Sequence, residues 1–344
     1  MFGSAGSRPW RRNRISPNLS SNQQATERQR LSIGQLGVPM VPTHRITLTS
    51  GTPITESDVT GATTIHLTPS GHDLVEIYDG YNWPVYQVPE QSLALTSNNA
   101  FSGYHQSGKN FFLGLFIHPS TGVLKFGSSV AWSSNTSTGT GAGTCEAELF
   151  QGRLVNKVSM TVRFGSASGD TATVPARQFV IFGGFRASAD GQATDSLTKR
   201  YVSNLQNPTI RSFRVNDAAA SWTYSTNTWR QSNGSTANQF EWFHCVAGRQ
   251  VFAMNSQTTG SSTATFRLIA LNIGIDTITN PPTGVGDNIG VSNATFYAVR
   301  GMYTGFPGIG YHYASSMELG AGTDTQTWYS NAGINFQLQG WTLN

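Results

Sequence analysis

The sequence predicts an all-β protein of two antiparallel β-sandwich or jelly-roll-like domains, joined near one short helix and preceded by an extended basic N-terminal arm. Three observations predict this class: short segments with period-two hydrophobicity, frequent turn signals, and a composition with little charge. Only 12% of the 344 residues are charged, whereas 37 are glycine and 11% are aromatic. Such a mixture suits half-buried strands joined by turns.

Period-two alternation begins after Pro42 and recurs to the end of the chain. Two further segments, NFFLGLFIHP (110–119) and RQFVIFGGF (177–185), are apolar on both faces, as in strands that lie between two layers. Turn signals such as SGTP, YDGYN and ASADGQ separate the segments. The alternating segments are HRITLTS (44–50), TTIHLTP (63–69), DLVEIYDG (73–80), VSMTVRFG (158–165), FRLIALNIG (266–274) and INFQLQGW (334–341).

One segment of the body has the features of a helix, TDSLTKRYVSNLQNP (194–208). Ser196 or the preceding aspartate can cap it, and Leu197, Tyr201 and Leu205 recur at every fourth residue. We place the domain boundary after this helix. The predicted units are the anchoring arm and linker (1–42), a structural β-sandwich (43–212) and a distal, binding β-sandwich (213–344).

Positive charge is concentrated in the arm, in RPWRRNRIS (8–16), where Arg8, Arg11, Arg12 and Arg14 surround Trp10. Residues 1–40 hold six arginines and one acid, which leaves 16 basic and 17 acidic residues elsewhere. Guanidinium groups beside an aromatic anchor are typical of a peptide that docks into another protein. A nucleic-acid contact and a solvated tail are the alternatives. No apolar stretch follows the arginines, which argues against a signal peptide or membrane insertion.

The body offers no recognisable catalytic set, and we predict no enzymatic activity, no cofactor and no metal. Its near-neutral charge argues against nucleic-acid binding. Cys145 and Cys245 have no framework spacing and are expected as isolated buried thiols. Asp170, Asp190 and Asp195 are the candidates for a glycosidase carboxylate pair, but each stands in a turn-like or capping context.

Aromatic and amide side chains in the second half are candidates for glycan binding. They are Trp229, Trp242, Trp328, Tyr329 and Asn331. The competing interpretation is that alternate aromatic residues fill a sandwich core. Because Trp328 and Tyr329 are adjacent, one of them must face outward if the segment is a strand.

The stretch ITLTSGTPITESDVTGATTIHLTPSGHDLVEIYDGYNW (46–83) resembles a module of tailed-bacteriophage virion proteins. Softer matches follow in order over most of residues 45–335, although the region 100–190 departs from the usual module. These matches are QSLAL (91–95), QGRLVNK (151–157), TDSLTKRYVSN (194–204), SWTYSTNTWRQSNG (221–234), GFPGIGYHY (305–313) and TWYSNAG (327–333).

The resemblance implies a virion structural protein, a tail fibre or tail-attached appendage, assembled in the cytoplasm of the host bacterium. A capsid decoration or head-fibre protein and a polysaccharide-degrading tailspike are the alternatives. The implied partners are other virion proteins (a tail adaptor, nozzle or capsid protein) and a host cell-surface glycan. A homo-oligomer, with a trimer favoured, would bury strand edges and apolar patches.

Overall fold

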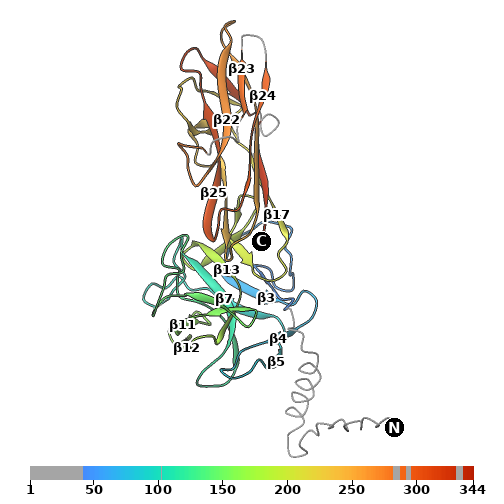
Figure 1. Ribbon diagram of the computed structural model, residues 1–344, viewed down its shortest axis with the longest axis vertical. Coiled ribbons are helices and arrows are strands. Elements are labelled where there is room, and N and C mark those ends of the chain that lie inside the picture. The colour runs from blue at the N-terminus through green and yellow to red at the C-terminus, as the bar shows by residue number, and fades with distance from the viewer. Residues whose placement is uncertain (1–41, 102, 282–286, 292–295, 331–335) are drawn as a thin grey trace, which may run out of the picture.

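In the computed structural model, strands make up almost all of the regular structure and gather into two lobes stacked along the long axis (Figure 1). The structure describes residues 42–101, 103–281, 287–291, 296–330 and 336–344. Within these ranges the elements are strands β1–β27 and one three-residue 3-10 helix, η1 (Ser232–Gly234). The predicted all-β class is confirmed.

The first lobe contains β1–β16. Its predicted strands at 44–50, 63–69, 73–80 and 158–165 are present as β1, β3, β4 and β11. A three-stranded sheet, β1-β3-β6, and the hairpin β4-β5 lie beside a larger sheet. The bounds are β1 (Arg45–Thr47), β2 (Val59–Ala62), β3 (Thr64–Thr68), β4 (Leu74–Glu76), β5 (Val85–Gln87), β6 (Gln91–Ala94), β7 (Asn110–Ile117), β8 (Leu124–Ser128), β9 (Ala147–Phe150), β10 (Arg153–Asn156), β11 (Met160–Arg163), β12 (Thr171–Val174), β13 (Phe179–Ala189), β14 (Gln192–Asp195), β15 (Lys199–Arg200) and β16 (Val202–Asn204).

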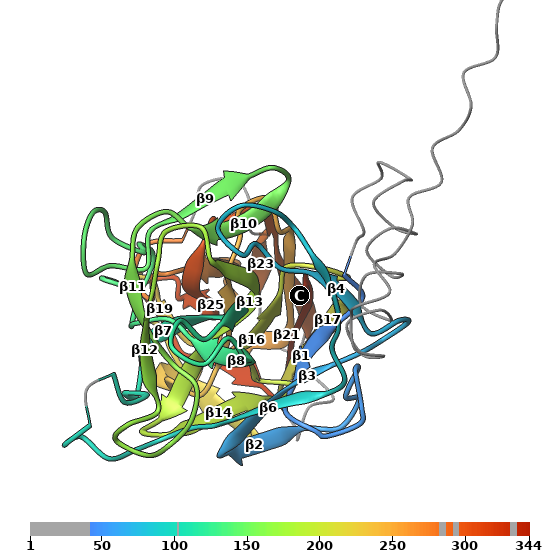
Figure 2. The same ribbon diagram turned by 90° about the horizontal axis from the view of Figure 1, so that it is seen from below.

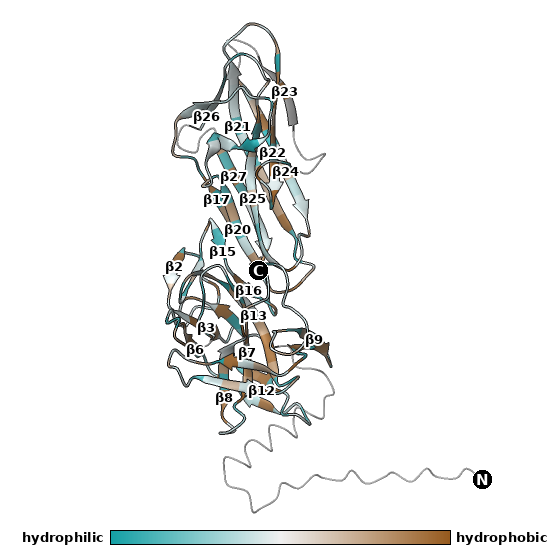
Figure 3. Ribbon diagram, turned by 90° about the vertical axis from the view of Figure 1, so that its left-hand side faces the viewer, coloured by the Kyte–Doolittle hydropathy of each residue, from teal (hydrophilic) through white to brown (hydrophobic). Residues whose placement is uncertain are grey.

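Strands β7 and β13 pair in the middle of this lobe and are buried on both faces, as predicted. Leu113 and Val180 belong to a core shared with β1, β3 and β6, whereas Phe112 and Phe179 belong to a second core beneath β11 and β12. Seen from below, β7 and β13 lie between these two groups of strands (Figure 2). The hydropathy colouring is browner along this pair than over most of the second lobe (Figure 3).

The helix predicted at 194–208 is wrong. The segment forms the end of β14, then β15 and β16, which pair with β13, β14 and β20. A spacing of four residues fits a strand as well as a helix, because two periods of two return to the same face. Tyr201 is buried while Leu197 is exposed, so the three spaced residues do not form one apolar stripe.

The second lobe is a sandwich of two facing sheets. Phe240 and Trp242 of one sheet pack against Phe213, Val251 and other inward residues of the opposite sheet. The sheets are β20-β25-β22-β23 with β19, and β17-β27-β21-β26-β18 with β24. The bounds are β17 (Ile210–Val215), β18 (Ser221–Thr223), β19 (Arg230–Gln231), β20 (Gln239–His244), β21 (Val251–Ser261), β22 (Arg267–Ile275), β23 (Asp287–Val291), β24 (Tyr297–Gly305), β25 (Gly310–Leu319), β26 (Gln326–Tyr329) and β27 (Phe336–Leu343).

One sheet runs through both lobes. β14 pairs with β15 at Asp195 and Arg200, and β15 pairs in parallel with β20 of the second lobe at Lys199–Glu241 and Arg200–Trp242. The predicted boundary at residue 212 falls within β17, whose six residues all pair with β27. The lobes are therefore joined by backbone hydrogen bonds as well as by the chain.

Candidate functional site

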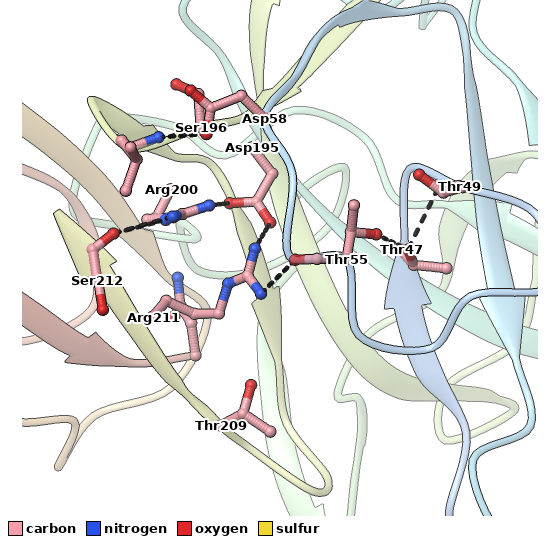
Figure 4. Close-up of polar contacts among 12 residues, drawn as sticks. Thr47, Thr49, Thr55, Asp58, Asp195, Ser196, Arg200, Thr209, Arg211 and Ser212 are labelled. Atoms are coloured by element: carbon pink, nitrogen blue, oxygen red, sulfur yellow. Dashed lines mark hydrogen bonds and ion pairs between the residues drawn. The ribbon is translucent and has the colours of Figure 1, made fainter. Parts of the chain in front are cut away.

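Charged side chains gather where the two lobes meet. Arg45 lies on β1, Asp58 just before β2, Asp195 at the end of β14, Arg200 on β15 and Arg211 on β17. We call these five residues the junction cluster; Figure 4 shows its contacts around Asp195. In a body with few charges, this concentration makes the junction the first candidate for a functional site.

Asp195 connects two arginines. Its Oδ1 accepts a hydrogen bond from Arg200 Nη1 at 3.2 Å, and its Oδ2 accepts one from Arg211 Nη2 at 2.8 Å. All three side chains are largely shielded from water, and burial lowers the pKa of Arg200. Because Arg211 belongs to the second lobe, the carboxylate forms an ion pair across the junction with little solvent screening.

The remaining donors of these arginines bind backbone carbonyl groups. Arg200 Nε and Nη2 donate to the carbonyl of Ser212 at 3.1 and 2.9 Å, and Arg211 Nη1 donates to that of Thr55 at 2.6 Å (Figure 4). Asp58 accepts a hydrogen bond from the backbone N–H of Leu197 at 2.8 Å. Each lobe thus satisfies polar groups of the other.

Arg45 is the least compensated member of the cluster. Its Nε donates to the carbonyl of Pro53 and its Nη2 to Thr209 Oγ1, both at 3.1 Å, while Nη1 has no hydrogen-bond partner among the described residues. Burial, together with the nearby Arg211 charge, lowers the pKa of Arg45 to about 10, so it stays protonated at neutral pH. The adjoining cavity has about 20 Å³, room for about one water molecule. It is too small for a sugar or nucleotide.

A second contact joins the lobes at the start of β25. The guanidinium of Arg186 lies 3.8 Å from the ring centroid of Tyr311, and its Nη1 donates to Asn135 Oδ1 at 3.0 Å. The hydroxyl groups of Tyr201 and Tyr311 both donate to Glu241 Oε2. Burial raises the pKa of both phenols, so they remain donors. Glu241 is therefore held by both phenols at Oε2, and its Oε1 accepts a hydrogen bond from Gln239 Nε2 at 3.2 Å.

The three aspartates considered for glycoside hydrolysis are held by separate partners. Asp170 accepts a hydrogen bond from the N–H of Ala167 at 2.8 Å, and Asp190 accepts one from that of Ser107 at 2.7 Å. Asp195 is occupied by its two arginines. Among the described residues there is no group of three or more His, Cys, Asp or Glu side chains that could hold a metal ion.

Two of the predicted glycan-binding residues are wrong. The side chains of Trp242 and Trp328 are fully buried in the core of the second lobe, so neither ring has a face open to a sugar. Alternation along β20 and β26 places both rings between the sheets. Asn331 and the arm residues Arg8, Trp10, Arg11, Arg12 and Arg14 lie outside the described residues.

Trp229 and Tyr329 are half-buried. The ring of Tyr329 lies 5.3 Å from that of Phe296, which is 65% exposed. Tyr329 is the outward-facing member of the adjacent pair with Trp328; the alternation predicted only that one of the two faces outward. Among the ring contacts and hydrogen bonds of the described residues, none joins Trp229 to Tyr329.

The cysteines match the expectation of isolated thiols. Cys145 and Cys245 are free and buried, and burial raises their pKa to about 12 and about 11. None of the helices in the described part of the chain has the length and apolar character that a membrane crossing needs.

Comparison with known proteins finds no family model and no curated protein that matches the chain. Among solved structures, a Bacillus thuringiensis Cry1Da tryptic core variant is 8% identical with a TM-score of 0.19; the match covers 90% of this chain and 53% of that one, about half its length. Infectious bursal disease virus Gx strain gives 10% identity, coverage of 89% and 82%, and a TM-score of 0.13. The VP2 subviral particle of that virus is 11% identical, with coverage of 93% of this chain and 86% of that one and a TM-score of 0.16. Similarity this low carries no argument about function.

Proposed function

We propose that this chain is a structural protein of a tailed-bacteriophage virion, a tail fibre or tail-attached appendage held by its Arg-rich arm. The second lobe then projects outward for host-surface binding or fibre assembly. The proposal rests first on the ordered sequence blocks that resemble phage virion proteins. It assigns the chain no reaction.

The single observation that best supports the proposal is where two of the resembling blocks lie, the specific block 46–83 and the softer block 194–204. Asp58 comes from the block 46–83, and Asp195 and Arg200 come from the block 194–204; all three contribute to the contacts at the junction. The residues that carry the resemblance therefore set the relative position of two lobes. That role suits a part that must keep its shape under load.

Exposed apolar side chains support a homo-oligomer, with a trimer favoured. Met302 and Phe306, on and just after β24, are 51% and 64% exposed, and Phe266 and Leu268, before and on β22, are 67% and 61% exposed. β24 is an edge strand that pairs only with β21, whereas β22 lies between β23 and β25. Exposed apolar surface of this kind is usually covered by another copy or partner. The docking partner of the arm is a tail adaptor, a nozzle or a capsid protein.

The test is incorporation into particles. In the phage that encodes the chain, the gene is replaced by versions lacking residues 1–32 or carrying Arg11→Ala, Arg12→Ala and Arg14→Ala together. Arg28→Ala with Arg30→Ala is the matched control of similar charge loss. We expect mass spectrometry to detect the wild-type chain and the control variant in purified virions. The version lacking residues 1–32 and the triple arginine variant should be absent from them.

Full incorporation of the version lacking residues 1–32, or absence of the wild-type chain from virions, would refute the proposal. So would release of oligosaccharides when the purified protein is incubated with host capsule. Imaging of labelled particles then decides between a tail and a head position.

A further inference from the structure

A groove lies on the first lobe, in the connection between β6 and β7, which runs outward from β6 in Figure 2. Its volume is about 460 Å³, and its lining includes Asn99, Phe101, Tyr104, Gln106 and, from another segment, Ala131. Pockets for small ligands usually measure about 300–1,000 Å³. We call it the 99–106 groove. It belongs to the region that departs from the resembling phage modules.

The chemistry of the lining is aromatic and amide. None of the residues that line the groove carries a charge at neutral pH. An aromatic face attracts the C–H groups of a sugar ring, because its π electrons are negative and the C–H edge is slightly positive. Each amide offers two donors and one acceptor, which match hydroxyl groups that both donate and accept. A neutral, hydroxyl-rich ring fits this lining better than an anion.

The polar groups of the groove are free to bind. Within the part of the chain that the structure describes, the side-chain amides of Asn99 and Gln106 and the hydroxyl of Tyr104 make no hydrogen bond. Phe101 and Tyr104 are half-buried, so part of each ring remains accessible. A ligand would therefore not have to displace a hydrogen bond between these side chains and the other described residues.

Two residues of the segment that carries these side chains, His105 and Gly103, are held by hydrogen bonds to the body of the lobe. His105 is fully buried: its Nδ1 accepts a hydrogen bond from the N–H of Thr96 at 3.1 Å, and its Nε2 lies 2.9 Å from Ser128 Oγ. Burial lowers the pKa of His105 to about 3, so the ring is neutral and Nε2–H donates to the serine. The carbonyl of Gly103 accepts a hydrogen bond from buried Arg163 Nε at 3.1 Å. Because these two backbone positions are already held in place, binding a ligand beside them costs less conformational entropy.

We propose that the 99–106 groove binds one neutral pyranose ring, stacked on Tyr104 and held by the amides of Asn99 and Gln106. The site lies on the first lobe, not in the second lobe where the sequence placed its glycan-binding candidates. It goes beyond the virion proposal and does not depend on it, because a purified chain binds sugar whether or not it enters a particle.

The experiment is saturation-transfer NMR and titration on the full purified chain. The probes are D-glucose, D-galactose and N-acetyl-D-glucosamine, with D-glucuronate as the anionic comparison. The variants are Tyr104→Ala, Tyr104→Phe and Gln106→Ala. Tyr81→Ala is the matched control, because Tyr81 is 90% exposed in the turn between β4 and β5.

We expect transfer to at least one neutral sugar, weakened roughly tenfold by Tyr104→Ala, about 1.4 kcal/mol. Gln106→Ala should also weaken it, whereas Tyr104→Phe should keep most of the binding and Tyr81→Ala all of it. No transfer to any neutral sugar would overturn the proposal. Equal binding by Tyr104→Ala and Tyr81→Ala, or a preference for D-glucuronate, would overturn it as well. If Tyr104→Ala does not fold, Gln106→Ala and Tyr104→Phe decide.

Discussion

Replacement of Asp195 by asparagine is the most direct test of the junction. The carboxylate accepts hydrogen bonds from Arg200 and Arg211 at 3.2 and 2.8 Å, and its side chain is 16% exposed. Asparagine keeps the shape but removes the negative charge, and it turns an amide toward guanidinium groups. Arg45, Arg200 and Arg211 would then be buried close together without this counter-charge.

Breaking a buried pair costs about 3–5 kcal/mol, and the slight exposure of Asp195 favours the lower end. At about 2–4 °C per kcal/mol for a unit of 150–250 residues, a loss of about 3 kcal/mol lowers the Tm by about 6–12 °C. Differential scanning calorimetry measures the shift. Because the two lobes need not unfold in one step, we also expect the calorimetric transition of the Asp195→Asn variant to separate into two transitions, one for each lobe.

The matched control is Asp190→Asn, an exposed turn aspartate that accepts a hydrogen bond from the N–H of Ser107. It should lower the Tm by no more than about 2 °C. Adding Arg211→Met to Asp195→Asn should recover part of the loss, since one unpaired charge is removed. An Asp195→Asn variant that melts within 2 °C of wild type would show that the ion pairs do not stabilise the junction.

Three further outcomes are expected. Gly310→Ala should lower the free energy of unfolding by about 1–3 kcal/mol and expose the loop 133–144 to protease. A Cβ at this position would lie 2.1 Å from the carbonyl oxygen of Asn135. Gly122→Ala is the control, because Gly122 also has a positive φ but open space around it. Burial raises the pKa of Glu318 from 4.5 to about 7. The protonated carboxyl therefore contributes stability that is fully present below pH 4.5 and is lost as the pH rises through 7. Glu318→Gln should flatten that part of a Tm–pH profile. The two buried cysteines should resist iodoacetamide at pH 8 in the native protein and react fully in denaturant, as intact mass will show.

The strands could be predicted because their signal is local. Alternation in 63–69 and 266–274 is present as β3 and β22, and the two-faced segments are β7 and β13. The segment 194–208 was misread because apolar residues four apart satisfy both periods. Only the pairing with β13 and β20, two strands outside the segment, shows that it is extended. A run with Thr, Tyr and Val among its members already favours strand over helix.

The junction cluster could not be predicted. Asp195 and Arg200 were visible as neighbours, but Arg45 and Arg211 come from other strands, and no spacing in one sequence places them together. The prediction for Trp328 is wrong for a related reason: alternation shows that one of Trp328 and Tyr329 faces outward, but not which one. Position between two sheets settled that Trp328 is buried.

The interior of the second lobe changes character along its length. Inward residues of β21 near the junction are apolar, Val251 and Ala253, whereas those farther out are Asn255, Gln257 and Thr259, all fully buried. Burying such groups costs free energy unless each is hydrogen-bonded, and the amide of Gln257 has no partner among the described residues. The outer half therefore combines these buried polar groups with aromatic packing, since Thr259 pairs with Trp328 and Gln257 with Phe336, and both rings are fully buried. Local opening should be favoured around Gln257, because a buried amide without a hydrogen-bond partner among the described residues lowers the stability of that part of the sandwich.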